Sequence, residues 1–332
     1  PYSGGDQAVA FSSDGRRYAY PCYHHGAAHV VVDGVEGPPY EEVCVPAFSP
    51  DGQRVTYGAR RNGRWHVVVD GIEGPACDGI SAPKFTGNGS RVAYSGRRGS
   101  RWYVMAGDRE FASGNDPIYP TVSSAGDHVA WREQRDARWI VFLDGVGGLA
   151  SDAKECQLSF SPDGSRLAYT IERDGRWHVV VDGDVVPGAG HTGIGYWGRR
   201  GPFSPDGKRW AYKAKHVGAW SGARWSVVTD RIEGPIYKTA DSPAFSPDSQ
   251  HVVYRATRRV RADEAQQHDD GRHPSDSALV NVIVVDHEEG PGFRMAHLYR
   301  PPFENDGSAG YFAATQKGLF RVTHVPPMPA EE

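Results

Sequence analysis

The sequence predicts an all-β fold, an eight-bladed β-propeller of four-stranded antiparallel blades that is closed by pairing the N-terminal strand with the last blade. Three observations predict it. One phrase of about 30 residues recurs along the chain, and its copies follow one another at the spacing of a four-stranded blade. The first residues of the chain also match the end of a repeat rather than its beginning.

The repeat is clearest in two copies, AFSPDGQRVTYGARRNGRWHVVVDGIEGP at 47–75 and SFSPDGSRLAYTIERDGRWHVVVDGDVVP at 159–187. Each copy has an anchor residue near its start, and the anchors are Phe11, Phe48, Phe85, Val122, Phe160, Phe203, Phe245 and Phe303. Successive anchors are 37, 37, 37, 38, 43, 42 and 58 residues apart. This spacing of roughly 40 residues is that of a propeller blade.

The copy at 47–75 predicts four strands, A to D, in order. Strand A is the anchor segment 46–49, and the turn SPDG that follows it supplies the Asp-Gly pair of a tight hairpin. Strand B, 54–59, alternates apolar and polar residues, and strand C, 65–71, is rich in β-branched residues. A second Asp-Gly turn leads to strand D. No long segment has a helical period, which excludes a βαβ fold.

The two ends of the chain predict closure of the ring. Pro1 and Tyr2 align with Pro39 and Tyr40, so the first residues form a strand D without a blade of their own. The last copy, 301–326, has strands A, B and C and no clear strand D. We expect the N-terminal strand to complete it, because this removes an exposed sheet edge. The single domain 1–332 then has blades at approximately 8–43, 44–80, 81–117, 118–155, 156–197, 198–240, 241–297 and 298–326 plus 1–6.

The phrase FSPDGxRxAY followed by VVVDG resembles the repeat of the TolB-type propeller family, a relative of the WD repeat, over essentially the whole chain. The resemblance implies a propeller architecture and favours a periplasmic or secreted location. The family includes peptide-binding periplasmic proteins and enzyme-associated propellers, so the resemblance implies no single function. TolB itself has six blades and an extra domain, and its partners are therefore not carried over.

Composition narrows the classes of partner. The net charge of −4 argues against nucleic acid as a partner, and no apolar run reaches the length of a membrane span. The four cysteines have no CxxC spacing, which predicts free thiols and no zinc site; they are Cys22, Cys44, Cys77 and Cys156. We expect a monomer without a cofactor.

Three sets of recurring residues are predicted to be structural. The turn aspartates are expected to brace their hairpins against basic residues three positions later; they are Asp14, Asp51, Asp163, Asp206, Asp248 and Asp306, with Arg17, Arg54, Arg166 and Arg209 as partners. The strand C tryptophans are expected to pack between blades; they are Trp65, Trp102, Trp139, Trp177 and Trp225. His29, His66 and His178 share the next position and are expected to be structural surface residues.

Charge differs between the two predicted faces of the disc. The B–C segments 58–64, 95–101 and 213–224 each carry +3, and 255–261 carries +4. The C–D turns 33–37 and 70–74 carry −2, and 286–290 carries −3. Since the B–C and D–A connections lie on one face of a propeller and the A–B and C–D turns on the other, the sequence predicts one basic and one acidic face.

The insertions predict where a ligand binds. Extra residues occur only in copies five to seven, in the D–A connections 188–201 and 292–302 and in the B–C connections 215–224 and 256–279. All four belong to the predicted basic face, and loops on a rigid scaffold commonly carry binding residues. The predicted ligand-binding residues are His191, Tyr196, Trp197, Arg199, Arg200, His216, Trp220, Met295, His297, Tyr299 and Arg300.

These residues favour a recognition module for an anionic peptide, glycan or small molecule, because arginine suits carboxylate, sulfate or phosphate and the aromatic rings suit an apolar body. Two alternatives stay open. A hydrolase or lyase would use His191, His216 or His297 as its general base, and a scaffold would bind a protein partner instead. The polar loop residues His268, Asp269, Asp270, His273 and Asp276 could gather a metal, but the stretch has the composition of a mobile loop, and we predict no metal site.

Overall fold

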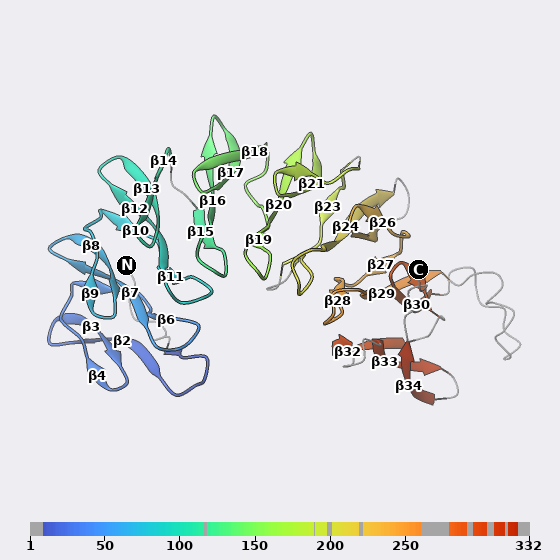
Figure 1. Cartoon of the computed structure of the whole chain (residues 1–332), viewed down its shortest axis with the longest axis horizontal. Coiled ribbons are helices and arrows are strands. Elements are labelled where there is room, and N and C mark those ends of the chain that lie inside the picture. The colour runs from blue at the N-terminus through green and yellow to red at the C-terminus, as the bar shows by residue number, and fades with distance from the viewer. Residues whose placement is uncertain are drawn as a thin grey trace, which may run out of the picture. The chain divides into compact units, whose positions relative to one another are not determined.

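The computed structural model describes residues 9–115, 118–188, 190–197, 201–218, 222–259, 279–290, 295–303, 309–315 and 318–324, and from 295 onward it describes the backbone alone. The chain divides into two compact units. One comprises residues 1–155 with 163–165, and the other comprises 156–162 with 166–332. The described residues form antiparallel β-sheets joined by turns, as the sequence predicts (Figure 1).

The first unit contains sheets 1 to 4 in chain order. Sheet 1 consists of β1 (Ala10–Phe11), β2 (Tyr18–His24), β3 (Ala27–Val32) and β4 (Val35–Glu36). Sheet 2 consists of β5 (Glu42–Val43), β6 (Ala47–Phe48), β7 (Val55–Arg61), β8 (Arg64–Val69) and β9 (Ile72–Glu73). Sheet 3 consists of β10 (Gly79–Ile80), β11 (Lys84–Phe85), β12 (Val92–Arg98), β13 (Arg101–Ala106) and β14 (Arg109–Ser113). Sheet 4 consists of β15 (Ile118–Val122), β16 (Val129–Arg135), β17 (Arg138–Leu143) and β18 (Val146–Ser151).

The second unit contains sheets 5 to 8. Sheet 5 consists of β19 (Leu158–Phe160), β20 (Leu167–Arg173), β21 (Arg176–Val181) and β22 (Asp184–Val185). Sheet 6 consists of β23 (Gly193–Ile194), β24 (Ala211–Gly218), β25 (Gly222–Thr229) and β26 (Ile232–Glu233). Sheet 7 consists of β27 (Thr239–Ala240), β28 (Ala244–Phe245), β29 (Val252–Arg259), β30 (Leu279–Val285) and β31 (Glu288–Glu289). Sheet 8, as described, consists of β32 (Met295–Phe303), β33 (Ala309–Thr315) and β34 (Gly318–His324).

The C–D hairpins have the turn geometry that their Asp-Gly pairs predict. In sheet 1, Asp33 and Gly34 have φ of 51° and 83°. Two successive residues with positive φ make a turn whose twist matches that of the flanking strands, and Asp and Gly tolerate this conformation best. The same turn in sheet 6 contains Arg231, with φ of 81°, where most copies have glycine.

Four pairs of neighbouring sheets are joined without a linker. Tyr40 exchanges two backbone hydrogen bonds of 2.9 Å with Ala28 of sheet 1, and the next residue, Glu41, donates one of 2.8 Å to Arg60 of sheet 2. Residue pairs 77–78, 191–192 and 237–238 repeat this arrangement. The chain therefore passes from one sheet to the next within a single peptide unit. It follows that short segments such as 42–43, placed by their sequence at the end of one repeat, pair with the following sheet.

The hydrophobic core lies between adjacent sheets within each unit. Between sheets 1 and 2, Val30 and Tyr40 pack with Tyr57 and Val68. Between sheets 5 and 6, Val179 packs with Tyr212 and Val228. Strands B and C are consequently buried on both faces, which explains why strand C is an unbroken apolar run rather than an alternating one.

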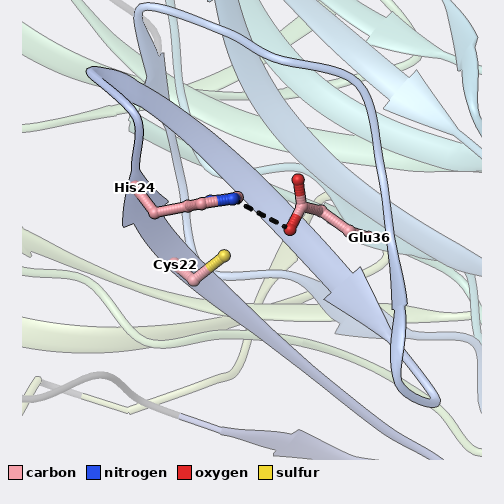
Figure 2. Close-up of side chains that lie close together, drawn as sticks. All are labelled: Cys22, His24 and Glu36. Atoms are coloured by element: carbon pink, nitrogen blue, oxygen red, sulfur yellow. Dashed lines mark ion pairs between the residues drawn. The ribbon is translucent and has the colours of Figure 1, made fainter.

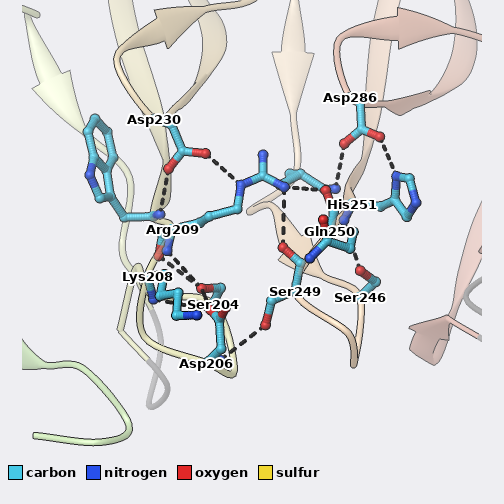
Figure 3. A network of polar contacts seen from close by, with 12 residues as sticks. Ser204, Asp206, Lys208, Arg209, Asp230, Ser246, Ser249, Gln250, His251 and Asp286 are labelled. Atoms are coloured by element: carbon cyan, nitrogen blue, oxygen red, sulfur yellow. Dashed lines mark hydrogen bonds and ion pairs between the residues drawn. The ribbon is translucent and has the colours of Figure 1, made fainter. Parts of the chain in front are cut away.

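The repeated arginine has a different partner from the one that the sequence suggested. Arg17 pairs with Asp33 of the C–D turn at 2.8 Å, and its Nη1 donates 2.6 Å to the carbonyl of Gln53 in sheet 2. Figure 3 shows this arginine clamp in sheets 6 and 7, where Arg209 binds Asp230 at 2.6 Å and donates to the carbonyls of Ser249, at 3.2 Å, and Gln250. Arg54 and Arg166 make the same contacts.

The aspartate of the A–B turn makes its hydrogen bonds within its own hairpin. Asp51 accepts hydrogen bonds from Ser49 Oγ at 2.5 Å and from the backbone N–H of Gln53 at 3.1 Å. Both bonds are made to the charged form, so they hold the pKa of Asp51 below its usual value. The predicted structural role of the aspartate is therefore confirmed. The charge of Arg54 acts on Asp51 as well, but the close ion pair of Arg54 is with Asp70.

The other structural predictions concern tryptophan, histidine and cysteine. Trp225 packs against the core cluster shared by sheets 6 and 7, as predicted. His66 Nδ1 lies 2.9 Å from the carbonyl of Gly74, whereas His29 is buried, with 7% exposure, instead of lying at the surface. The four cysteines are free thiols. The described residues include no helix long and apolar enough to cross a membrane.

Candidate functional site

An arginine–glutamate pair recurs between strand B and strand D of the sheets. Arg61 Nη1 lies 2.7 Å from Glu73 Oε1 in sheet 2, and Arg98 Nη1 lies 2.9 Å from Glu110 Oε2 in sheet 3. Sheet 7 repeats the pair with Arg258 Nε and Glu289 Oε2 at 2.8 Å. The arginine stands four residues after a strand B tyrosine in each of these sheets.

A side chain from the preceding sheet contacts each of these pairs. Tyr40 is the crossing residue between sheets 1 and 2, that is, the last residue hydrogen-bonded to sheet 1 before the chain enters sheet 2. Its ring lies edge-on to that of Tyr57, with 6.3 Å between centroids, and its hydroxyl donates a hydrogen bond of 3.0 Å to Glu73. The guanidinium group of Arg61 stacks over the ring of Tyr40, with its Cζ 4.6 Å from the ring centroid. Tyr237 lies in the same way against Tyr254 of sheet 7, at 6.2 Å. A tyrosine, an arginine and a glutamate therefore recur at two of these junctions, whereas Cys77 takes the place of the tyrosine between sheets 2 and 3.

Sheets 5 and 6 place two histidines in this arrangement. His216 on β24 occupies the arginine position, and His191, the crossing residue between the sheets, occupies the tyrosine position. His216 Nε2 lies 2.9 Å from Glu233 Oε1 on β26. The two imidazole rings are perpendicular, with an interplanar angle of 88° and 5.3 Å between centroids. We call His191, His216 and Glu233 the His–His–Glu cluster.

Two hydroxyl groups surround the His–His–Glu cluster. Ser226 Oγ, on β25, donates 2.6 Å to Glu233 Oε1 and lies 2.9 Å from His216 Nε2. Tyr212 OH lies 3.4 Å from His191 Nε2. Burial raises the pKa of Tyr212 well above its usual value, so this hydroxyl keeps its proton at neutral pH.

His191 is the most buried member of the cluster, with 9% exposure. Its Nδ1 is buried and has no hydrogen-bond partner among the described residues. Burial lowers the pKa of His191, and the carboxylate of Glu233 opposes that shift only in part. His191 is therefore a neutral imidazole at pH 7, in which one ring nitrogen carries a proton and the other a lone pair.

Sheet 1 carries a related group of side chains around His24, which stands where sheet 2 has Arg61. Cys22 and His24, on β2, face Glu36, on β4, along one side of the sheet (Figure 2). His24 Nε2 lies 3.6 Å from Glu36 Oε2, and His29 Nδ1 lies 3.2 Å from Glu36 Oε1. Burial raises the pKa of Cys22, so its thiol is protonated at neutral pH.

The structure brings together only some of the residues that the sequence analysis selected. His191 and His216 meet in the cluster, while Tyr196 is 75% exposed and Trp197 packs partly buried against the core of sheets 5 and 6. Arg199, Arg200 and Trp220, and the loop residues 268–276, lie outside the described residues. Met295, His297, Tyr299 and Arg300 lie on strand β32 and not in a loop; only their backbone is described.

The predicted contrast in charge between two faces is reduced by ion pairs. In the B–C segment of sheet 2, Arg60 pairs with Glu41 at 3.7 Å and Arg64 with Asp78 at 3.3 Å. Both acids belong to D–A connections, which the count of B–C charges omitted. The C–D turns are likewise neutralised in part, since the clamp arginines bind their aspartates.

Sequence reasoning missed Glu233, Tyr212 and Ser226 as neighbours of the two histidines. Glu233 was counted only as one charge of a C–D turn, because strand positions were compared within a repeat and not across sheets. The signal was available: histidine replaces arginine four residues after the strand B tyrosine in sheet 6 and also in sheet 1, at His216 and His24.

Comparisons with known proteins identify no family for the chain. No family model matches the chain, and no curated protein matches it. Among solved structures it is similar to TolB from Acinetobacter baumannii, at 17% identity over 54% of this chain, with a TM-score of 0.32; the chain spans about half of that protein, 52%. The β-propeller domain of the Trilobed protease from Pyrococcus furiosus has 13% identity over 68% of this chain and 79% of its own, with a TM-score of 0.33. The Dos1 propeller has 10% identity over 95% and 90%, with a TM-score of 0.38. The described residues form an all-β protein of antiparallel sheets, and two of these solved structures are named as propellers.

Proposed function

We propose that this chain is an eight-bladed β-propeller closed by its N-terminal strand, and that it is a recognition module for an anionic small molecule, glycan or peptide. The repeated four-stranded sheets, with their cores between neighbours, support the propeller architecture. The eight anchors of the sequence repeat support the number of blades.

One observation supports the position of the ligand site. The tyrosine, arginine and glutamate arrangement that recurs between sheets is replaced by two histidines at the junction of sheets 5 and 6. The inserted segments 188–201 and 215–224 begin or end at this junction. A departure from a repeated structural arrangement, next to insertions, is expected where a repeat scaffold carries a specific site.

The chemistry of the neighbouring side chains supports an anionic ligand with an apolar body. Tyr196 is 75% exposed, five residues after His191, and offers a free aromatic face. Arg199 and Arg200 follow it in sequence and would supply forked donors to a carboxylate, sulfate or phosphate. In this proposal, Met295, His297, Tyr299 and Arg300 extend the site from strand β32.

Calorimetric titration with a panel of anions, acidic peptides and sulfated or carboxylated sugars tests this proposal. Arg199→Ala with Arg200→Ala is expected to weaken binding of the anion that binds best by at least tenfold, which corresponds to about 1.4 kcal/mol. Arg16→Ala is the matched control, because Arg16 is an exposed arginine in a turn of sheet 1. Equal affinity in the double variant and the control would refute the arginine assignment.

A hydrolase or lyase at the same place is the second candidate. It is favoured by the contact of Glu233 with His216 Nε2, because a carboxylate beside one imidazole nitrogen fixes the tautomer and the orientation of the ring. Glu233→Gln should then lower turnover of a substrate found among esters, phosphoesters and uronates, and should change the pH profile. Turnover that does not respond to Glu233→Gln would exclude this histidine as the base.

If no anion of the panel binds, the result favours the third function, a scaffold for a protein partner. In that case, we expect the chain to form a stable complex with a protein of its native source, and the complex should survive replacement of Arg199 and Arg200.

A further inference from the structure

We infer that the His–His–Glu cluster, made of His191, His216 and Glu233, is a binding site for a divalent transition metal ion of the zinc type. The inference does not depend on the anionic ligand proposed above. It adds a metal to a chain for which the cysteine pattern predicted none.

The donor atoms are already gathered. One ligand atom from each of the three residues lies within 4.8 Å of the other two, and His216 Nε2 and Glu233 Oε1 are 2.9 Å apart. Two imidazoles and one carboxylate form a set that zinc favours, with the fourth position left for water or a ligand. Nitrogen donors select such an ion over Mg²⁺ or Ca²⁺, which prefer oxygen.

The donors are also held by outer contacts of the kind that orient metal ligands. Ser226 Oγ donates 2.6 Å to the carboxylate of Glu233, and Tyr212 OH lies 3.4 Å from Nε2 of His191. Hydrogen bonds to the ligating groups fix their orientation and reduce the rearrangement needed on binding.

An unsatisfied buried atom gives an independent reason for a ligand here. His191 Nδ1 is buried and lacks a hydrogen-bond partner within the described ranges. A buried nitrogen without a partner costs free energy. With the ring proton on Nε2, Nδ1 carries a lone pair, and a bound cation would satisfy this nitrogen by accepting that lone pair. Arg176 and His178 lie near enough to disfavour a positive charge, so metal–nitrogen bonding and the carboxylate of Glu233 must overcome that repulsion.

Two other junctions with the same arrangement lack this ligand set. The corresponding residues are Tyr40, Arg61 and Glu73 between sheets 1 and 2, and Tyr237, Arg258 and Glu289 between sheets 6 and 7. These trios satisfy the glutamate with an arginine and offer no nitrogen lone pair to a metal. Two replacements, tyrosine by histidine and arginine by histidine, create the site.

The same comparison supplies the test variant. His191→Tyr with His216→Arg restores the tyrosine, arginine and glutamate found at the neighbouring junctions, so it should fold while lacking both nitrogen ligands. The experiment uses a parent chain with Cys22→Ala and His24→Arg, because Cys22, His24 and Glu36 also lie within ligating distance of one another. Alanine and arginine stand at these positions in sheet 2, as Ala59 and Arg61.

Zn²⁺ titrated calorimetrically into this parent chain is expected to show one tight equivalent, and Co²⁺ should give the visible absorption of a four-coordinate site. His191→Tyr with His216→Arg should weaken that equivalent at least 100-fold and abolish the absorption, with the melting temperature unchanged or raised. His66→Gln, a histidine that contacts a backbone carbonyl in sheet 2, should leave binding unchanged.

Two results would overturn the inference: a parent chain that binds no stoichiometric Zn²⁺, or a double variant that binds it as tightly as the parent. Arg199→Ala with Arg200→Ala should leave Zn²⁺ binding intact. Failure of the metal site and failure of the anion site are therefore separate outcomes.

Discussion

Single residues in this chain are best understood through the position that they share with their equivalents in other repeats. The clearest case is the second residue of the C–D turn, which is glycine at Gly34, Gly71 and Gly183 and has a positive φ in each. Arg231 adopts the same conformation with φ of 81°, and its side chain is exposed. A non-glycine residue in this region costs of order 1 kcal/mol, so the turn of sheet 6 is strained.

Arg231→Gly is therefore expected to raise the free energy of unfolding by about 1 kcal/mol, because glycine removes the steric cost of the left-handed conformation. Urea denaturation measures the change. Arg101→Gly, at an exposed strand position of β13, should have the opposite sign, since glycine weakens a strand. A loss of stability in Arg231→Gly would contradict the strain.

The A–B turn aspartates predict how stability responds to acid. Hydrogen bonds from serine hydroxyls and backbone N–H groups lower the pKa of Asp14, Asp51, Asp206 and Asp248. A carboxyl whose pKa is lower in the folded state stabilises the fold above its unfolded pKa, near 4, and this stability is lost as pH falls through the folded pKa.

Replacing these four aspartates by asparagine should reduce the loss of melting temperature below about pH 4. Sheet 3 shows that asparagine fits, because Asn88 accepts 2.7 Å from Thr86 Oγ1 and 3.1 Å from the N–H of Ser90. Thermal denaturation from pH 7 to pH 2 measures the slope. An acid slope identical to that of the parent would show that other carboxyls control it.

At the scale of the element, the arginine that follows an A–B turn connects its own sheet to the next one. Arg209 binds Asp230 in its own sheet and two carbonyls in sheet 7, and it stacks over Phe245 at 5.6 Å. The guanidinium group makes these contacts together because its donors form a planar fork. The phrase SPDGxR therefore encodes a contact between repeats as well as a turn within one.

Arg209→Leu is expected to lower the free energy of unfolding by about 1–3 kcal/mol, since it leaves Asp230 and the two carbonyls without their charged donor. Arg209→Lys should recover only part of the lost stability, because an ammonium group lacks the planar fork of donors that a guanidinium group has. Urea denaturation measures both, with Arg16→Ala within about 0.5 kcal/mol of the parent as the surface control. Equal stability of Arg209→Leu and the parent would show that the arginine clamp does not contribute to the free energy of unfolding.

Element pairing also explains what the sequence could predict. Strands B and C and both turns follow from alternation, β-branched runs and Asp-Gly pairs, so they were predicted near their observed bounds. The partner of Arg17 was not, because Asp14 is nearer in sequence while Asp33 is nearer in space. Likewise, His216 and Glu233 are two strands apart, and only the folding of β24 to β26 into one sheet brings them together.

At the scale of the whole molecule, the proposed ring predicts that its two ends depend on each other. Deleting residues 1–6 should expose the edge of the last blade and lower the melting temperature by at least about 4 °C. Deleting 328–332, which lie beyond the last repeat, should have little effect. Scanning calorimetry of both truncations measures this. Equal melting temperatures for the two truncations would contradict closure by the N-terminal strand.

The one-residue passage between sheets has a mechanical consequence. Tyr40 is hydrogen-bonded into sheet 1 while Glu41 is hydrogen-bonded into sheet 2, and the same holds at 77–78, 191–192 and 237–238. A chain with no slack at these four points has no hinge there, so tension applied across them is carried directly from one sheet's hydrogen bonds to those of the next. Stretched by its ends, such a chain would resist in discrete steps, each step being the rupture of one repeat from its neighbour.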